Sequence, residues 1–420
     1  MRQADVNIPL GIPDVRVLQT ATNERGEIII TIESTKQGTR CRKCGKWITK
    51  SHGLDEWVTI RHLPAFGRRT YLRYRPKRYE CQGCEGHPTT TEILEWHERN
   101  SPHSFAYDNQ LLLQLVNSTV EDVSAKEDIG YDSVVGALER RIATKIDWTV
   151  IAEIVALGLD EISLRKGRRD YITLVTGRLA NGEIILLGVL SGHEKAETVD
   201  FLRSIPPRIV EKIQAVCCDL WEAYIQAVRE ELSHVRIVAD RFHVAKHYYE
   251  AADQERKREL KHLKETLTKE EYKMLEGSMY AFRKRHDDLN DKERKILNRF
   301  LKLAPFAKKA YELREQLTAI FDQRLSKDQA QSKILRWMKK VQECGLQCFD
   351  TFMKLLAARW KEITNYFFER ENSSFVEGFN NKVKVLKRRC YGIFNLQHIF
   401  QRIYLDLTGY RLFASTPISG

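Results

Sequence analysis

The sequence predicts an α/β core that is interrupted by a large all-helical insertion and preceded by two small N-terminal segments. Three observations support this fold class. Strand-like and helical patterns alternate from about residue 151 to 242. From about 243 to 410, apolar and charged positions recur at helical spacing, and Pro305 is the one proline that interrupts the pattern. Residues 1–100 combine short β-like runs with paired cysteines.

The alternating region contains five strand candidates and two helices. Asn181-Gly182 is a hairpin signal because both residues tolerate positive φ. The candidates, in chain order, are strands Ile154–Leu159, Tyr171–Leu179, Glu183–Leu190, helix Glu197–Ser204, strand Ile213–Cys218, helix Trp221–Glu231 and strand Val235–Ala239. The order β-β-β-α-β-α-β matches a ribonuclease H-like fold, in which parallel strands extend a three-stranded meander.

A chain of 420 residues is too long for one ordinary domain. We expect five segments. They are a zinc-binding, DNA-binding domain (1–100), a helix-turn-helix (101–148), the first part of the ribonuclease H-like core (149–243), the helical insertion (244–365) and the last part of the core (366–412).

Bulk composition favours a polyanionic partner and excludes some classes of protein. Lys and Arg outnumber Asp and Glu by 69 to 57, for a net charge of +12, which suits nucleic acid. The N-terminus shows no export signal, and no apolar run approaches the ~20 residues of a membrane helix. We therefore expect a soluble, cytoplasmic protein with no membrane partner. Its odd count of nine cysteines then indicates metal binding and free thiols rather than a disulfide framework.

Three acidic residues are the candidate catalytic site. Asp160 and Asp219 each end an apolar strand, and in the expected sheet these two strands are neighbours. Carboxylates at one sheet edge repel each other unless a cation lies between them. Mg²⁺ prefers such oxygen ligands, and two ions ~3.5–4 Å apart can serve phosphodiester chemistry. Glu377, in the first turn of a helix that Ser373 or Ser374 caps, is the candidate third ligand.

Each of these residues also has a structural reading. An aspartate at a strand end is commonly a turn residue or a helix cap. Taken alone, Glu377 is commonly a solvent-exposed helix residue. Asp240 also ends a strand and is a rival for the second position, although the fifth strand lies farther from the first. His243 is a candidate phosphate contact or proton carrier, and a lone histidine is commonly structural. The joint pattern of strand ends and a polar, basic helix favours the catalytic reading.

Cys41-x-x-Cys44 and Cys81-x-x-Cys84 predict a structural zinc site, because four thiolates complete a tetrahedron. A redox role for either pair is the alternative, although nothing thioredoxin-like surrounds them. Cations alternate with tyrosines nearby, as expected of a strand that follows DNA phosphates. A solvated β face with paired charges would look similar. The DNA-binding candidates here are Arg73, Arg75, Lys77 and Arg78.

Two helical stretches supply further DNA-binding candidates. Residues 108–143 have the pattern of a helix-turn-helix whose last helix carries Arg140 and Arg141, although a small helical linker would look similar. Glu377 is followed along one helix face by amides and cations. The candidates on that face and just after it are Asn381, Lys384, Lys387 and Arg388.

At these residues the chain resembles the ISL-three family of bacterial insertion-sequence transposases. The matching pieces are Gly158–Gly167, Asp219–Tyr224, Ala239–Val244 and Val376–Lys384 continuing to Gly392. The resemblance covers essentially the whole chain. It implies a catalytic core of the Asp-Asp-Glu (DDE) type, with a helical insertion between the second Asp and the Glu, which here lie 158 positions apart. Leu220 and Ser373-Ser374 depart from the common pattern, but neither touches a carboxylate.

The hypothesis is therefore a DNA transposase that binds terminal inverted repeats and catalyses metal-dependent DNA cleavage and strand transfer. Two Mg²⁺ ions, or Mn²⁺, and a structural Zn²⁺ are the expected cofactors. Terminal repeats and target DNA are the expected partners, with a homodimer assembled on DNA in a bacterial nucleoid. A metal-dependent nuclease of the same fold and a non-catalytic, zinc-dependent DNA-binding protein are the alternatives.

Overall fold

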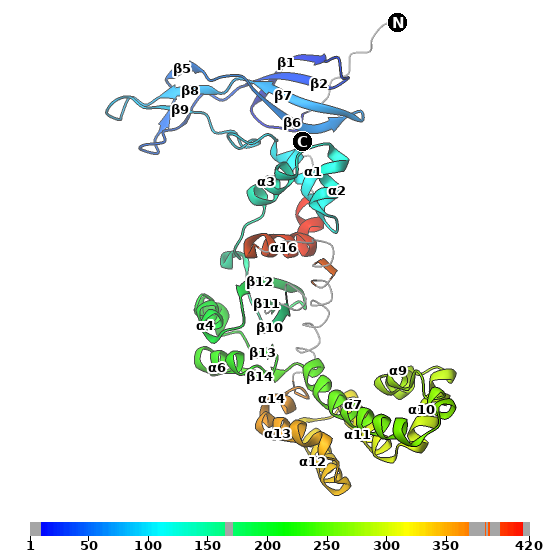
Figure 1. Cartoon of the computed structure of the whole chain (residues 1–420). Helices are drawn as coiled ribbons and strands as arrows, with labels where there is room; N and C mark the ends of the chain where they lie inside the picture. Colours follow the sequence, from blue (N-terminus) through cyan, green and yellow to red (C-terminus); the bar gives the residue numbers. More distant parts are fainter. Residues whose placement is uncertain (1–9, 164–170, 369–382, 384, 387–394, 415–420) are drawn as a thin grey trace. The chain divides into compact units, whose positions relative to one another are not determined.

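The computed structural model divides the chain into two compact units, which we describe separately. Unit 1 combines Met1–Thr144 with Arg388–Gly420, and unit 2 is Lys145–Lys387. The structure describes residues 10–163, 171–368, 383, 385–386 and 395–414 (Figure 1).

Unit 1 contains a four-stranded sheet with the order β1-β2-β7-β6. The pair β2–β7 is parallel, and the other two pairs are antiparallel. Alternate residues of β2, such as Ile28 and Ile30, face a small apolar core that also contains Leu72 and Trp96. The strands are β1 (Val15–Thr22), β2 (Ile28–Ser34), β6 (Val58–Ala65) and β7 (Arg68–Tyr74).

The paired cysteines lie in a region built from two further small sheets. One is β3 with β4, and the other has the order β5-β8-β9. Its apolar core is very small, with Cys41, Ile48, Tyr79 and Cys81 as the buried members. The strands are β3 (Thr39–Arg40), β4 (Trp47–Ile48), β5 (Ser51–Leu54), β8 (Lys77–Glu80) and β9 (Thr89–Thr91).

Among the residues that the structure describes, four helices belong to unit 1, and three of them lie where the sequence predicts helices. Ser104 and Thr119 cap two of these helices by accepting hydrogen bonds from backbone N–H groups. The fourth, α16, packs against α1 and α3. Leu405, a fully buried residue of α16, belongs to the same apolar cluster as Leu111 and explains this placement. The helices are α1 (Phe105–Leu115), α2 (Val120–Glu127), α3 (Tyr131–Arg141) and α16 (Leu396–Phe413).

Unit 2 is built on a five-stranded sheet with the order β12-β11-β10-β13-β14. The first three strands form an antiparallel meander, and β13 and β14 extend it in parallel to β10. Gly182, with φ of +84°, forms the predicted hairpin turn between β11 and β12. The strands are β10 (Ala156–Ser163), β11 (Tyr171–Arg178), β12 (Ile184–Ser191), β13 (Ala215–Cys218) and β14 (Arg236–Ala239).

Each face of this sheet contributes apolar side chains to a cluster with helices, and α4 and α6 lie on one side of it in Figure 1. On one face Leu157 and Leu159 pack in an apolar cluster with residues of α4 and α6. On the other face Ala156 and Cys217 belong to the core of the helical insertion. Asp160, within β10, and Asp219, directly after β13, thus lie on a sheet that is packed on two sides. The helices of the first face are α4 (Lys195–Arg203), α5 (Pro207–Val210) and α6 (Glu222–Glu231), with η1 (Trp148–Val150) beside them.

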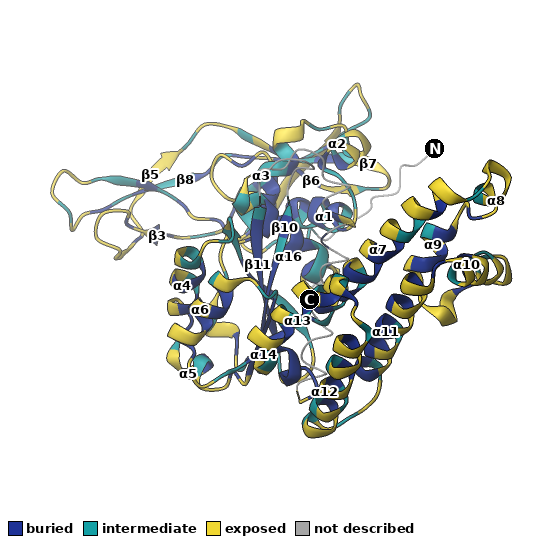
Figure 2. Cartoon of the chain, turned by 60° about the horizontal axis from the view of Figure 1, so that its bottom comes forward, coloured by how far each residue is buried: buried dark blue, intermediate teal, exposed yellow. Residues whose placement is uncertain are grey.

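The helical insertion follows β14 directly and begins with a helix of 26 residues. Its helices bury the sides that face one another and expose the outer sides (Figure 2). Among the helices that the structure describes, none is long and apolar enough to cross a bilayer. The insertion contains α7 (Arg241–Thr266), α8 (Lys269–Lys273), α9 (Ser278–Arg283), η2 (His286–Asp288), α10 (Asp291–Leu303), α11 (Pro305–Asp322), α12 (Lys327–Cys344), η3 (Gln347–Phe349), α13 (Asp350–Ala358) and α14 (Trp360–Asn365).

Candidate functional site

Three carboxylates and one histidine of unit 2 meet where the parallel strands β13 and β14 end beside β10. One ligand atom from each of Asp160, Asp219, Asp240 and His243 lies within 4.8 Å of the others. Asp160 and Asp240 are 6% and 7% exposed, so their charges are largely removed from water. Carboxylates this close and this buried repel each other, and the cluster therefore favours a bound cation.

The strand register explains how residues so far apart in sequence converge. Asp160 lies on β10, whose parallel neighbour β13 ends one residue before Asp219. Cys218, the last residue of β13, pairs with Ala239, the last residue of β14. Asp219 and Asp240 come directly after these residues and therefore lie side by side. Asp240 is also the N-cap of α7 and accepts a hydrogen bond from the N–H of Phe242 at 2.8 Å.

His243, in the first turn of α7, lies between two of these carboxylates. Its Nδ1 pairs with Asp219 and lies 3.2 Å from Oδ2 of Asp240. Burial by itself would lower the pKa of His243, but the hydrogen bonds and negative charges of Asp219 and Asp240 raise that pKa to about 10. A metal ion bound to the same oxygens would compete directly with this imidazolium.

Asp240 and His243 are the members of the cluster that we had ranked low from sequence. The fifth strand does lie farther from the first, as expected, but a ligand atom of Asp240 still lies within 4.8 Å of those of Asp160 and Asp219. The sequence did carry a signal, because Asp240 follows an apolar run just as Asp160 and Asp219 do. Glu377, the expected third ligand, lies outside the described residues.

The donor set of this cluster matches a hard divalent cation. Carboxylate oxygens are the ligands that Mg²⁺ and Mn²⁺ prefer, whereas a thiol-rich site would select zinc. Cys218 is fully buried, and burial raises its pKa far above the usual range, so it is no thiolate donor here. The carboxylates alone therefore offer the charge that such an ion requires.

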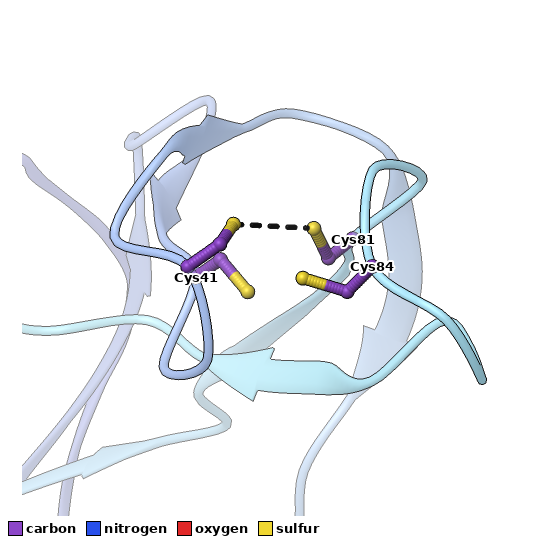
Figure 3. A group of neighbouring side chains, drawn as sticks. Cys41, Cys81 and Cys84 are labelled. Carbon is purple, nitrogen blue, oxygen red and sulfur yellow. Dashed lines mark hydrogen bonds between the residues drawn. The ribbon is translucent and has the colours of Figure 1, made fainter.

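The four predicted cysteines form a second cluster, in unit 1. Their sulfur atoms all lie within 4.8 Å of one another (Figure 3). Backbone N–H groups of Cys44 and Lys43 lower the pKa of Cys41 to about 6, which favours a thiolate. The neighbouring sulfur of Cys44 and burial raise the pKa of Cys84 to about 12. Four convergent sulfurs fit a closed, tetrahedral zinc site.

The predicted DNA-binding cations of the β-rich region differ in their surroundings. The guanidinium of Arg73 lies 4.6 Å from the ring of the half-exposed Trp57, and that of Arg75 lies 6.0 Å from it. Lys77 instead donates to the backbone oxygen of Lys36, and Arg78 donates to Thr89 at 2.7 Å. Arg75 also donates from Nε to the backbone oxygen of Asp55 at 2.8 Å. The exposed Arg73 thus offers charge beside an aromatic surface, while Arg75, Lys77 and Arg78 make hydrogen bonds within the domain.

The two arginines of α3 have distinct partners. Arg140 donates two hydrogen bonds, of 2.8 and 2.9 Å, to the fully buried carboxylate of Asp108, which also lies 3.0 Å from His103. Arg141 donates to Asn109 and lies over the ring of Phe105. Arg140 therefore neutralises a buried charge. The candidates near Glu377, namely Asn381, Lys384, Lys387 and Arg388, lie outside the described residues.

Comparison with known proteins assigns both clusters to one family. The family model of the ISL3 DDE transposases, described as a transposase, matches residues 157–403. A second model, described as the zinc-finger of the transposases of IS204, IS1001, IS1096 and IS1165, matches residues 37–84.

Two curated relatives are similar over most of the chain. One is the transposase for insertion sequence element IS1001 of Bordetella parapertussis, with 26% identity over 90% of this chain and 91% of the relative. The other is the transposase for insertion sequence element IS1557 of Mycobacterium tuberculosis, with 24% identity over 89% of this chain and 86% of the relative. The matched regions include the cysteines and Asp160, Asp219 and Asp240. The chain therefore belongs to the ISL3 family of insertion-sequence transposases.

Proposed function

We propose that this transposase binds the terminal inverted repeats of its element and catalyses metal-dependent DNA cleavage and strand transfer. The observation that carries the proposal is the convergence of Asp160, Asp219, Asp240 and His243 within 4.8 Å at one sheet edge. The antiparallel meander extended by two parallel strands is consistent with a ribonuclease H-like core. In such open sheets, sites form at the carboxyl ends of strands.

The carboxylates of Asp160, Asp219 and Asp240 would hold divalent cations, with Glu377 as the expected further ligand. When bound, Mg²⁺ or Mn²⁺ at such a site polarises phosphodiester oxygens and lowers the pKa of attacking water. The protein positions the carboxylates through the strand register, and the apolar clusters on the two faces hold the sheet in place. His243 balances the negative charge of Asp219 and Asp240 and lies where it can contact a DNA phosphate.

We propose that unit 1 recognises the DNA. Helices α1–α3 would act as a helix-turn-helix, and Arg141 of α3 would contact the DNA. Arg73 and Arg75, supported by Trp57, would bind phosphates from the β-rich region. Because one transposition event joins two element ends, the active assembly is at least a homodimer on DNA.

The test uses a labelled fragment of the element end with purified full-length protein and Mg²⁺ or Mn²⁺. Wild-type protein should cut at the end and join a pre-cleaved end to target DNA. Asp160→Asn should lose both reactions and retain end binding. Cutting without joining would assign the nuclease function instead. Binding without any metal-dependent cutting would assign a DNA-binding protein, and full strand transfer by Asp160→Asn would refute the proposed site.

A further inference from the structure

Trp221 is an exposed aromatic side chain beside the carboxylate cluster, and the reaction chemistry does not use it. It follows Asp219 by two residues, so the two Cα atoms are at most roughly 7.6 Å apart. Its side chain is half-exposed, with 48% of the residue surface open to water. A large apolar ring left in water at the edge of a charged site lies within reach of a nucleotide whose phosphate binds there.

The orientation of this ring is fixed by its neighbours. Nε1 of Trp221 donates a hydrogen bond of 3.1 Å to the backbone oxygen of His193. The ring of His193 meets that of Trp221 edge-on, with centroids 5.1 Å apart, and meets Tyr171 on another side at 5.4 Å. Nδ1 of His193 lies 2.9 Å from Oε2 of Glu161. Residues from β10 (Glu161), from just after β12 (His193) and from the start of β11 (Tyr171) thus support the ring of Trp221.

These contacts restrict what the free face of Trp221 can bind. Its one polar group, the indole N–H, already has an acceptor, so the exposed face offers only π and apolar contact. Such a face suits the flat ring of a nucleobase, which can stack whatever its sequence. A phosphodiester held through the divalent cations that the proposed function places at these carboxylates would bring bases of the same strand to this position.

We infer that Trp221 stacks against a base next to the phosphodiester that the site cuts, and that it does so as a binding residue rather than a metal ligand. The inference rests on the proposed function for the position of that phosphodiester. A base that leaves the duplex to stack here would expose the scissile bond to the carboxylates. His193 and Glu161 act as positioning residues for the ring.

A photocrosslink tests the contact without any catalysis. Full-length Asp160→Asn is bound to an end fragment that carries 5-iododeoxyuridine at one position at a time, within three nucleotides of the element end. We expect one position to crosslink to the peptide that contains Trp221 and to lose that crosslink in Asp160→Asn/Trp221→Ala. Formation of the complex without any crosslink to Trp221 overturns the inference.

A kinetic readout separates stacking from a structural role. Trp221→Ala should slow end cleavage by roughly 5- to 140-fold, the effect of one lost base–aromatic stack, while end binding stays within about threefold. Trp221→Tyr should recover most of the rate because it restores a ring. Tyr280→Ala, which removes a 67% exposed ring of the insertion, is the control and should cleave normally. Equal rates for Trp221→Ala and wild type would overturn the inference, whereas a wild-type protein that crosslinks but never cuts would refute only the proposed function.

Discussion

The cysteine cluster of unit 1 and the carboxylate cluster of unit 2 are both suited to metal ions but are embedded in the protein differently. The cysteines themselves make up much of a very small core, with Ile48 and Tyr79. The carboxylates lie at the edge of a sheet that is packed on both faces by two large apolar clusters. In the first region a metal would take the place of a hydrophobic core, whereas in the second two large apolar clusters support the sheet beside the metal site.

This difference teaches how to tell a structural metal site from a catalytic one. A closed site of four thiolates leaves no coordination position for a substrate and contributes its binding energy to folding. Clustered carboxylates destabilise the fold that holds them, and such groups persist where they serve a reaction. Loss of a metal ligand should therefore unfold the cysteine region of unit 1, whereas in unit 2 it should reduce activity and leave stability unchanged.

The largest effect is expected when the cysteine cluster is broken. Cys81→Ser should abolish stoichiometric zinc binding and unfold the surrounding β-rich region, because a structural zinc site contributes about 10–16 kcal/mol of apparent binding free energy. Zinc content by mass spectrometry and backbone hydrogen exchange of residues 39–91 measure the two consequences. Binding to the terminal repeat should be lost as well.

Cys344→Ser is the matched control for this change. Cys344 is a partly buried thiol at the end of α12 and is no member of the cluster. Its replacement should leave zinc content and DNA binding unchanged. A folded, repeat-binding Cys81→Ser protein without zinc would contradict the structural assignment of this site.

The carboxylate site should lose activity without losing stability. Asp240→Asn should reduce metal-dependent cleavage by at least about 100-fold, since even an outer-shell partner of a metal can cost that much. Its free energy of unfolding in EDTA should stay within about 1 kcal/mol of wild type, because asparagine also caps a helix and the lost attraction to His243 is offset by a lost repulsion from Asp160 and Asp219. End-cleavage rates and urea denaturation measure the two effects.

Asp328→Asn, which changes an exposed carboxylate in the first turn of α12, controls for charge alone. It should cleave at the wild-type rate. Wild-type cleavage by Asp240→Asn would instead remove Asp240 from the site and leave Asp160 and Asp219 with Glu377.

In a third cluster, a cation of the protein itself neutralises a buried carboxylate: Arg140 pairs with Asp108. Arg140→Ala should destabilise unit 1 by about 3–5 kcal/mol, since it leaves the fully buried Asp108 without its bidentate partner. Chemical denaturation followed by hydrogen exchange in α1 and α3 measures the loss. Arg141→Ala is the neighbouring control and should retain stability while weakening repeat binding.

The pH dependence of this cluster has a definite sign. Burial opposes ionisation of Asp108, but hydrogen bonds from His103 and Arg140 outweigh it and lower the pKa of Asp108 below 3.8. Its contribution to stability is therefore complete above the unfolded pKa near 3.8 and is lost as pH falls through the lower folded pKa. Asp108→Asn should flatten the acid limb of the stability curve below about pH 4. An unchanged acid limb would contradict the assigned partners.

The smallest effect is expected at the surface of the β-rich region. Arg73→Ala should weaken binding to all DNA sequences to a similar degree. Loss of one phosphate contact should reduce the slope of log Kd against log salt concentration by roughly 0.9. Titrations at several salt concentrations measure it. Arg16→Ala, at an exposed arginine paired with Glu33, should leave the slope unchanged.

The sequence by itself determined the elements and the local metal motifs. The cysteines of each pair are three residues apart, so local geometry brings them together and the spacing alone predicted a zinc site. The apolar run before Asp219 predicted a strand end there, and Asn181-Gly182 predicted the hairpin between the second and third strands. These features depend on side-chain periodicity and local backbone preferences, which a sequence displays directly. The strand end predicted at Asp160 was wrong, because β10 continues to Ser163 through its pairing with β11.

The tertiary structure alone decided which distant residues act together. The register of β13 with β14 brings Asp240 and His243 into the carboxylate cluster, although strand order alone had argued against Asp240. Burial of Asp108 engages Arg140, which the sequence had suggested for DNA. Both outcomes depend on which charge lies opposite another in space and how much water separates them, and this information is absent from any local pattern of residues.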